Sequence, residues 1–281
     1  MILVTGATGN VGRQVVSELL RMDVDVRALT RHPDTADLPS DVEIIRGDPS
    51  DPHAVDAAVT GADAVFLMWP FLRLTADDAA PAIDVVRRHG ARVVFLSSLA
   101  VRDDQQQESP NTRFHADIEQ LIERSGTEWT LLRCAGFATN TLMWAPEIRA
   151  GGVVRWPYRT AARSLLHERD IAAVAVRALT GDGHGGAKYM VTGPQSLTQI
   201  EELRAIGEAI GRPLRWEEIS PDVARQQMVQ QLPPELVDGV LDAHAGFVTT
   251  PEPVTTTVEE VTGAPAHTFS EWATDHAADF R

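Results

Sequence analysis

The stretch Met1-Ile-Leu-Val-Thr-Gly-Ala-Thr-Gly-Asn-Val-Gly12 decides the fold of this chain. Its apolar start is typical of a strand that is buried on both faces of a parallel sheet. Gly6 allows a tight turn, Gly9 lets a pyrophosphate approach the backbone, and Gly12 lets the following helix pack against the strand. The helix start adds free N–H groups and a positive dipole end. Strand, turn and helix in this order predict a dinucleotide-binding site.

The composition narrows the class of protein. The chain has 281 residues, of which 43% are hydrophobic, and this length suits one α/β domain with a second lobe. Its net charge of −15, without a basic block, argues against nucleic acid and anionic membrane surfaces as partners. No apolar run is long enough to span a bilayer, and we expect no bound metal.

The single cysteine, Cys134, excludes an internal disulfide and is typical of a reducing compartment. The first expected strand begins at Met1, so we expect no signal peptide and a cytoplasmic protein. The oligomeric state stays open between a monomer and a homodimer.

Strand and helix patterns alternate through the first half of the chain. This alternation predicts an α/β fold, a doubly wound parallel sheet of the Rossmann type over residues 1–136. The expected strands cover residues 2–4, 24–29, 42–45, 64–67, 92–96 and 129–132. The expected helices cover about 11–22, 75–89 and 112–124.

The pattern loosens after residue 136, and we expect a smaller α+β lobe over 137–281 that mainly binds substrate. Segments at about 165–193 are expected to return to the sheet, with a helix at 170–179 and a strand at 188–191. Further helices are expected at 198–210, at 221–245 with a break at Pro233-Pro234, and at 269–280. The broken pair could cover a binding cleft, or it could serve packing alone.

The residues after the second expected strand indicate which nicotinamide dinucleotide binds. A carboxylate there bonds the ribose 2′-hydroxyl of NAD, whereas an arginine accommodates the 2′-phosphate of NADP. This chain has Thr30 and Arg31, and no carboxylate before Asp34. Arg31 can bind a phosphate with two hydrogen bonds, and Thr30 can add a hydroxyl. The sequence therefore predicts NADP(H) in preference to NAD(H).

Two more residues could support the adenosine half of the cofactor. Arg13 lies in the first helical turn and could reach the adenosine phosphate. Asp48 could accept a hydrogen bond from the adenine amino group, although Gly47-Asp-Pro-Ser50 is also typical of an Asx turn. The residues expected to contact the cofactor are Gly6, Thr8, Gly9, Asn10, Val11, Gly12, Arg13, Thr30, Arg31, Asp48, Met68, Trp69, Ser97 and Phe137.

Motifs along nearly the whole chain match one known family in combination. They are Val4-Thr-Gly-Ala-Thr-Gly-Asn-Val-Gly-Arg13, Leu29-Thr-Arg31, Gly47-Asp48, Phe95-Leu-Ser-Ser98, Glu119-Gln-Leu-Ile-Glu-Arg-Ser-Gly126, Trp129-Thr-Leu-Leu-Arg133, Gly136-Phe137, Asn140, Arg169-Asp-Ile-Ala172 and Gly193-Pro194. This set resembles the NmrA-like group of atypical short-chain dehydrogenases/reductases. The resemblance implies a Rossmann domain, a C-terminal substrate lobe and NADP(H) binding. Members of the group include quinone and ketone reductases, plant reductases of phenolic compounds, and regulators that bind the cofactor without turnover.

The chain departs from the usual catalytic pattern of short-chain dehydrogenases, which is a serine, a tyrosine and a lysine four residues after the tyrosine. Ser98 stands where the serine belongs, and it could donate to a developing oxyanion. Asn111 and His115 stand where the tyrosine and lysine are expected, and His115 could hold the ribose or shuttle a proton. The remaining tyrosines and the single lysine lack the spacing: Tyr158, Tyr189 and Lys188.

Cys134 replaces the proline that usually follows the arginine in this family, so it could shape the nicotinamide pocket or serve as a small buried hydrophobe. Aromatic and methionine side chains that follow the fourth and sixth strands are candidates for a substrate pocket, with core packing as the alternative. The pocket candidates are Phe71, Met143, Trp144 and Trp156.

The sequence thus predicts an NADPH-dependent reductase that transfers hydride to a carbonyl or quinone of an aromatic, polycyclic, polyketide-like substrate. Because the tyrosine is missing, the proton could come from His115, from water or from an acidic group of the substrate itself. The alternative from another class is a non-catalytic regulator that senses NADP(H). An epimerase or dehydratase that retains its cofactor is a third possibility.

Overall fold

The computed structural model describes residues 1–70, 75–103 and 109–281. Contacts between residues divide the chain into two compact units. Unit 1 comprises Met1–Cys134, Glu168–Val191 and Glu260–Gly263. Unit 2 comprises Ala135–His167, Thr192–Glu259 and Ala264–Arg281. The chain therefore leaves unit 1 after the sixth strand and returns to it twice.

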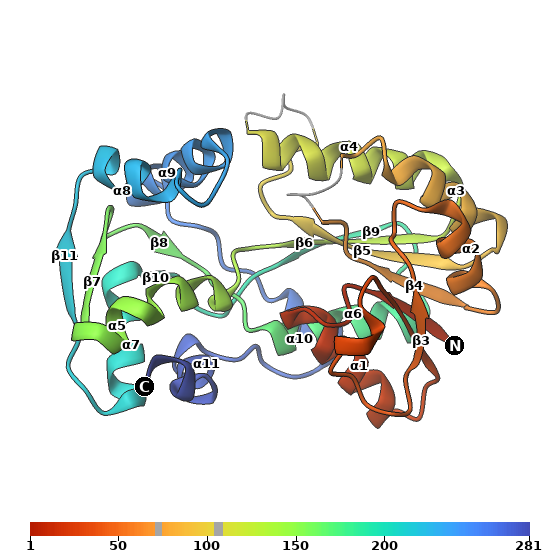
Figure 1. The fold of residues 1–281 in the computed structure, drawn as a ribbon, viewed down its shortest axis with the longest axis horizontal. Helices are drawn as coiled ribbons and strands as arrows, with labels where there is room; N and C mark the ends of the chain where they lie inside the picture. The colour runs from red at the N-terminus through yellow and green to blue at the C-terminus, as the bar shows by residue number, and fades with distance from the viewer. Residues whose placement is uncertain (71–74, 104–108) are drawn as a thin grey trace. The chain divides into compact units, whose positions relative to one another are not determined.

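Unit 1 is built on a sheet of seven parallel strands (Figure 1). The strands are β1 (Ile2–Thr5), β2 (Val26–Thr30), β3 (Glu43–Arg46), β4 (Ala64–Leu67), β5 (Arg92–Ser98), β6 (Trp129–Cys134) and β9 (Ala187–Val191). They lie in the order β3-β2-β1-β4-β5-β6-β9, so the direction of winding reverses between β1 and β4. Ligands of such sheets bind where this reversal leaves a crevice at the carboxyl ends of the strands. The doubly wound α/β fold expected from the sequence is confirmed.

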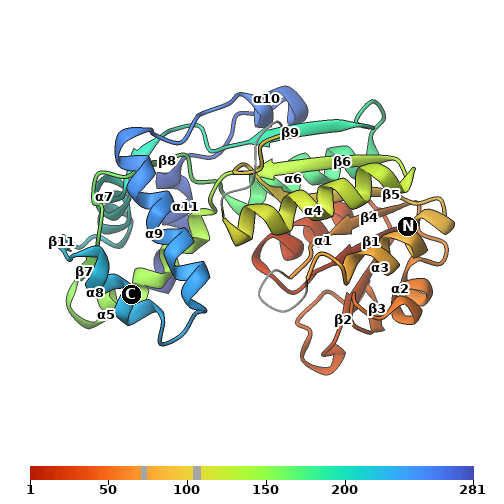
Figure 2. The ribbon, with the colours of Figure 1, turned by 90° about the horizontal axis from the view of Figure 1, so that it is seen from above.

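Helices cover both faces of this sheet (Figures 1 and 2). On one face α1 (Asn10–Arg21) packs against α6 (Glu168–Thr180). On the other face α2 (Pro52–Val59), α3 (Ala79–Arg88) and α4 (Pro110–Ser125) pack in sequence. A 3-10 turn, η1 (Pro33–Thr35), follows β2. Leu3, Val65 and Phe95 belong to the apolar cluster under α2, α3 and α4, which explains the uninterrupted hydrophobic runs of the strands.

Unit 2 is smaller and mixes helices with two short ladders. In one ladder β7 (Val153–Trp156) pairs in parallel with β11 (Arg215–Glu218). In the other, β8 (Ala162–Arg163) pairs antiparallel with β10 (Leu197–Thr198). The helical elements are η2 (Ala138–Trp144), α5 (Ala145–Gly151), α7 (Gln199–Ile210), α8 (Pro221–Met228), α9 (Pro234–Thr249), α11 (Phe269–Asp275) and η3 (Ala277–Phe280). The helix α10 (Thr257–Thr262) spans the boundary between the two units.

Some elements differ from the expectation. Strands β5 and β6 each extend two residues further than expected, to Ser98 and Cys134. The final helix is interrupted at His276, where α11 ends and η3 begins. The break at Pro233-Pro234 is confirmed, because α8 ends at Met228 and α9 begins at Pro234.

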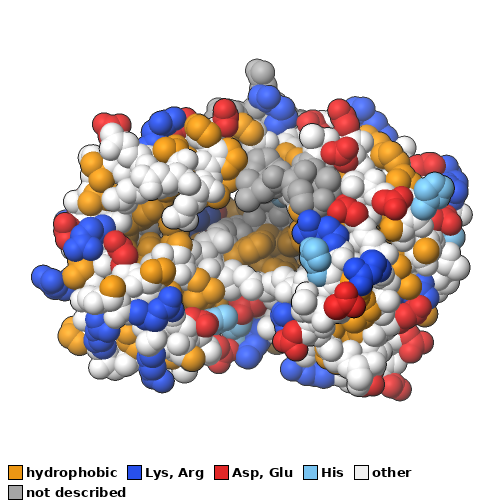
Figure 3. All heavy atoms as spheres, viewed as in Figure 1, with side chains coloured by type: hydrophobic (Ala, Val, Ile, Leu, Met, Phe, Trp, Pro, Cys, Tyr) orange, Lys and Arg blue, Asp and Glu red, His pale blue; other side chains and the backbone are white. Residues whose placement is uncertain are grey.

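No described helix is both long and apolar enough to cross a membrane. Within the same residues, no group of three or more histidine, cysteine or acidic side chains could hold a metal ion. On the face shown in Figure 3, acidic and basic side chains are interspersed.

An ionic network, buried at Arg133 and Glu119 and exposed at Asp103, lies at the extended ends of β5 and β6. Arg133 donates from Nη2 to Glu119 Oε2 at 2.6 Å and to Asp103 Oδ1 at 2.6 Å. Ser97 donates its hydroxyl proton to Glu119. Lys188 of β9 joins through Asp103 Oδ1 at 2.7 Å. The network satisfies polar groups that would otherwise be costly inside the sheet.

Removing one member of this network should destabilise the fold. The Arg133 and Glu119 side chains are only 8% and 3% exposed, so Glu119→Ala leaves a buried guanidinium short of one partner. We expect the free energy of unfolding to fall by about 3 kcal/mol. Glu123→Ala is the matched control on the same helix, since Glu123 pairs with Lys188 in a more exposed position. The control should lose about 1 kcal/mol or less. Urea unfolding of both variants measures this, and equal losses would contradict the prediction.

Candidate functional site

The glycine loop after β1 has a geometry that side chains would disrupt. Gly6 has a φ of +66°, in the left-handed region that favours glycine. The Gly9 N–H donates to the Gly6 carbonyl at 2.9 Å and closes the turn. A Cβ added to Gly12 would lie 2.1 Å from the same carbonyl oxygen. These contacts let α1 begin directly against the end of β1.

The start of α1 is suited to bind an anion. Gly9 is the N-cap and provides no side chain, and no described side chain caps the first turn. Thr8 and Asn10 are exposed, while Val11 and Gly12 are buried against the sheet. An uncapped N-terminus offers N–H groups and the positive end of the helix dipole to phosphate oxygens. The described residues therefore fit the pyrophosphate of a dinucleotide.

The end of β4 lies beside this loop. The Met68 N–H donates to the Thr5 hydroxyl at 2.8 Å, which joins the carboxyl ends of β4 and β1. The Met68 side chain packs over Gly6, where an added Cβ would lie 2.4 Å from Met68 Cε. Trp69 is buried in the core of unit 1, and its indole N–H donates to the Thr75 carbonyl at 3.0 Å. Met68 thus lines the loop, whereas the Trp69 indole serves core packing.

Two arginines lie at the neighbouring ends of β2 and β3: Arg31 directly follows β2, and Arg46 ends β3. Arg31 is exposed, and Thr30 accepts a hydrogen bond from the His32 N–H at 3.3 Å. Asp34, the nearest carboxylate, is paired with Arg46 Nη2 at 2.7 Å. Arg46 thus neutralises the carboxylate nearest in sequence to Arg31.

The other two residues expected near the adenosine have partners within unit 1. Arg13 donates from Nε to the Thr8 carbonyl at 2.9 Å and from Nη1 to Asp37 Oδ2 at 3.1 Å. Asp48 Oδ1 accepts from the Ser50 N–H at 3.0 Å and from its hydroxyl at 2.8 Å, so the Asx turn is present. The contact of Asp48 with adenine stays a prediction.

Ser98 and His115 lie at the carboxyl end of β5 and in α4. Ser98 Oγ accepts from the Ala100 N–H at 3.3 Å, which leaves its hydroxyl proton available to another acceptor. Burial lowers the pKa of His115, and its Nδ1 bonds the Asn111 carbonyl at 2.8 Å. A carbonyl can only accept, so Nδ1 carries the proton and Nε2 of the neutral ring is an acceptor. A neutral His115 ring with a free acceptor at Nε2 is better suited to accept a hydrogen bond from a hydroxyl group than to donate a proton to a product.

Other residues singled out from the sequence have structural partners. The Ser97 hydroxyl is taken up by Glu119. Cys134 is buried, which raises the pKa of its thiol well above the usual range and fits its role as a small hydrophobe. The Tyr189 hydroxyl bonds His184 Nδ1 at 2.8 Å. Lys188 pairs with two carboxylates, and Phe137 is the N-cap residue of η2 in unit 2.

Three of the four candidate pocket residues line a single cavity of about 360 Å³ in unit 2. Met143 is half exposed there, while Trp144 and Trp156 are 4% and 6% exposed. Phe71 lies outside the described residues. The cavity, which we call the unit 2 cavity, is lined by Asn140, Thr141, Met143, Trp144, Trp156, Arg163, Leu165, Gln199, Glu202, Met228, Leu232, Val240 and His244.

The unit 2 cavity contains polar groups that the sequence analysis missed. Glu202 of α7 is 2% exposed, and burial raises its pKa to about 8. His244 of α9 bonds the Val240 carbonyl through Nδ1 at 2.8 Å, and burial lowers its pKa to about 4. Arg163 pairs with Glu252 at 3.3 Å and lies over the Phe247 ring. Nothing in the local sequence marks Glu202, which follows the exposed Glu201 in an ordinary helix start.

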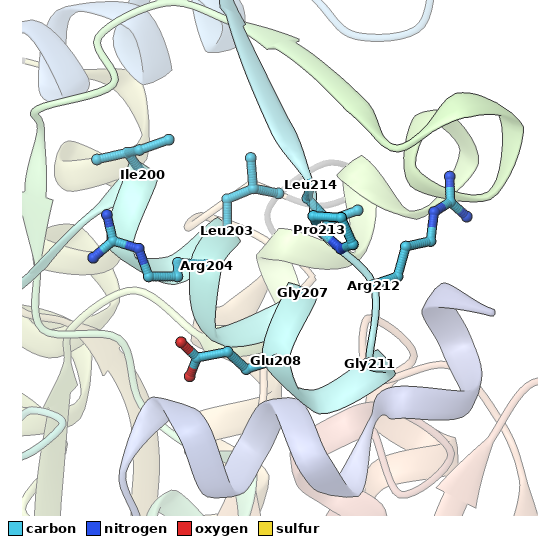
Figure 4. A pocket seen from close by; sticks show the side chains of 9 residues that line it. All are labelled: Ile200, Leu203, Arg204, Gly207, Glu208, Gly211, Arg212, Pro213 and Leu214. Carbon is cyan, nitrogen blue, oxygen red and sulfur yellow. The ribbon is translucent and has the colours of Figure 1, made fainter.

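A second hollow of about 450 Å³ lies on another side of α7 (Figure 4). It is formed by α7 and the segment that leads to β11. Leu203 and Leu214 provide its apolar surface, and Arg204 and Arg212 extend to opposite sides. This open surface lacks the buried polar groups of the unit 2 cavity.

Comparison with known proteins identifies the family. A family model described as NAD(P)H-binding matches residues 6–182, and the chain belongs to this family. The family that the sequence motifs resemble is thereby confirmed. A (4-alkanoyl-5-oxo-2,5-dihydrofuran-3-yl)methyl phosphate reductase of Streptomyces griseus is 40% identical over 100% of this chain and 99% of its own. An NAD(P)H azoreductase of Xenophilus azovorans is 35% identical over 100% of this chain and 99% of its own.

Solved structures share the fold. An NADPH-dependent quinone oxidoreductase of Escherichia coli complexed with NADPH has a TM-score of 0.83 at 22% identity, over 98% of this chain and 99% of its own. A triphenylmethane reductase of Citrobacter sp. complexed with NADP(H) has a TM-score of 0.82 at 20% identity, over 99% of this chain and 100% of its own. At these identities the likeness supports the fold alone.

The buried carboxyl of Glu202 makes stability depend on pH. Its folded pKa of about 8 lies above the ordinary value of 4.5, so the folded protein holds a proton that the unfolded chain releases between these values. Stability therefore falls as pH rises from 4.5 to 8. Glu202→Gln removes this loss. We expect its Tm, relative to wild type, to be at least about 2 °C higher at pH 8 than at pH 4.5.

Differential scanning calorimetry at both pH values measures this effect. Glu208→Gln is the matched control, because Glu208 is an exposed carboxylate on the same helix. The control should shift Tm equally little at both values. A gain for Glu202→Gln that is the same at both pH values would show that the folded pKa of Glu202 is not raised above its ordinary value.

Proposed function

We propose that this protein uses NADPH to reduce a small molecule whose carbonyl or quinone group is conjugated to an aromatic or unsaturated system. The chain is an NAD(P)H-dependent reductase, because it belongs to the NAD(P)H-binding family and two named reductases align with its full length. The proposed preference for NADPH rests chiefly on one observation. The uncapped glycine turn before α1 is followed by Arg31 at the end of β2.

The cofactor half of the proposal concerns unit 1. The N–H groups at the start of α1 would hold the pyrophosphate, and Met68 would line the loop beside it. Arg31 and Thr30 would bind the 2′-phosphate, since Arg46 already occupies the nearest carboxylate, Asp34. The bound nicotinamide would supply the hydride. This arrangement favours NADPH over NADH.

The catalytic half follows from the protonation states. Ser98 can donate its hydroxyl proton to a negative oxygen that forms on the acceptor. His115 is neutral and accepts at Nε2, so it would hold a ribose hydroxyl rather than protonate the product. The proton would then come from water or from the acceptor's own acidic groups.

An acceptor that spreads negative charge over conjugated atoms requires little help from a protein acid. Quinones and ketones flanked by phenols belong to this class. The names of the two full-length relatives point to acceptors of a related kind, an azo group and an unsaturated furanone. A conjugated carbonyl or quinone therefore suits this chain better than an isolated ketone.

Turnover of candidate acceptors tests the proposal. NADPH consumption by the full chain is followed with a methylated naphthoquinone, a hydroxylated polycyclic ketone, an azo dye and an unsaturated lactone, with NADH in parallel. We expect consumption with at least one conjugated carbonyl compound, faster with NADPH than with NADH. Tight NADPH binding without consumption of any acceptor would instead indicate a sensor of the cofactor.

The role of Arg31 can be separated from general effects of charge. Arg31→Ala should raise the KM for NADPH about tenfold, which corresponds to about 1.4 kcal/mol of lost phosphate binding. The KM for NADH should stay the same, because NADH has no 2′-phosphate. Arg21→Ala, an exposed arginine at the far end of α1, is the matched control and should leave both values unchanged. An equal rise for both cofactors would reject the assignment.

A further inference from the structure

We propose that Asp37 limits the preference of this protein for NADPH over NADH. Its carboxylate forms an ion pair with Arg13, and the 2′-phosphate of NADPH would have to take this arginine from it. The inference rests on the proposed function, because it concerns the cofactor of the proposed reductase. It assigns a role to an acidic residue outside the set expected to contact the cofactor.

The first observation is that Arg13 bridges two segments of unit 1. Its Nε donates to the Thr8 carbonyl at 2.9 Å, in the glycine loop that precedes α1. Its Nη1 donates to the Asp37 carbonyl at 2.9 Å and to Asp37 Oδ2 at 3.1 Å, in the segment between β2 and β3. The guanidinium group is therefore fixed between the loop proposed to hold the pyrophosphate and the segment that begins with Arg31.

The second observation is that these bonds do not use all the donors of Arg13. A guanidinium group has five N–H donors in a fixed fork. The bonds to Thr8 and Asp37 run from Nε and Nη1, and within the described part of the chain no hydrogen bond is made by Nη2. The Arg13 side chain is 42% exposed, so part of it is accessible to a ligand. Arg13 can therefore bind a phosphate oxygen while it keeps its bond to Thr8.

The third observation is that the carboxylate in this pair is weakly held. The Asp37 side chain is 91% exposed, and ion pairs in such positions contribute little because water and salt screen them. A phosphate group carries more negative charge than a carboxylate and forms strong charge-assisted hydrogen bonds with arginine. A 2′-phosphate can therefore displace the Asp37 carboxylate from Arg13.

A second arginine–aspartate pair keeps the segment between β2 and β3 in place during this exchange. Arg46 of β3 donates from Nη2 to Asp34 Oδ2 at 2.7 Å and from Nη1 to the Arg31 carbonyl at 3.4 Å. The bond from Arg13 to the Asp37 backbone carbonyl does not depend on the Asp37 side chain. Removal of the Asp37 charge therefore leaves the segment anchored by the other bonds.

These contacts predict different effects on the two cofactors. NADPH and NADH share the pyrophosphate, and only NADPH has the 2′-phosphate. Binding of NADPH includes the loss of the Arg13–Asp37 pair and the approach of a phosphate to a carboxylate, whereas binding of NADH includes neither. Because specificity is a difference between two affinities, a repulsive group that acts on one ligand changes it directly. Asp37 therefore lowers the preference for NADPH that Arg31 is proposed to create.

Calorimetric titration of the full chain with NADPH and with NADH, without an acceptor, tests the inference. Asp37→Asn keeps an oxygen that can accept from Arg13 and removes the negative charge. At low ionic strength we expect the Kd for NADPH to fall about threefold and the Kd for NADH to stay the same. At about 1 M salt, where the screening length is about 3 Å, the gain should disappear. Asp41→Asn is the matched control, because Asp41 is an exposed acid in the same segment, and it should behave as wild type.

A double variant tests whether Asp37 acts through Arg13. Arg13→Ala alone should raise the Kd for NADPH about tenfold, because it removes a charge-assisted contact with phosphate. Asp37→Asn added to Arg13→Ala should produce no further change, since the two substitutions then affect the same interaction.

Three results would overturn the inference. One is a Kd for NADPH that Asp37→Asn leaves unchanged at low ionic strength. Another is an equal gain for NADPH and NADH, which would assign Arg13 to the pyrophosphate that both cofactors share. The third is the same gain in the Arg13→Ala background, which would show that Asp37 acts on the phosphate without Arg13. Failure of the proposed function is a different result, the absence of NADPH consumption by wild type with every acceptor, and the titrations decide the role of Asp37 without an acceptor.

Discussion

The architecture of unit 1 depends on the close approach of Gly12 to the carbonyl of Gly6. A Cβ on Gly12 would lie 2.1 Å from that oxygen, so only glycine lets α1 start so near the end of β1. This contact aims the uncapped start of α1 at the point where the strand order reverses. The positive end of the helix and the crevice of the sheet therefore coincide, and the exposed Arg31 directly follows the neighbouring strand β2.

Buried polar groups are treated differently in the two units: those of unit 1 are paired, whereas some of those in unit 2 are not. In unit 1, Arg133, Glu119 and Asp103 satisfy one another, and the network holds the long ends of β5 and β6. In unit 2, Glu202 and Trp144 are equally buried but lack partners among the described residues. A satisfied network stabilises the fold, whereas each buried polar group without a partner costs folding free energy.

The fold could be predicted from sequence where the signal is local. The glycine spacing and the apolar runs mark β1, α1 and β4 because turn geometry and burial act on neighbouring residues. The ends of β5 and β6 were underestimated because Ser97 and Arg133 look like loop residues until their buried partners are known. Glu202 was missed for the same reason: its burial comes from chain segments far away in sequence, and only the folded unit reveals it.

The missing tyrosine and lysine change what the protein requires of its acceptor. A neutral His115 whose proton is engaged by the Asn111 carbonyl cannot replace the phenol as an acid. The chain instead offers the Ser98 hydroxyl, which accepts from the Ala100 N–H and can donate its own proton. Donors of this kind stabilise charge that the acceptor itself can carry. The loss of the acid and the proposed use of conjugated carbonyl acceptors would then be two consequences of the same chemistry.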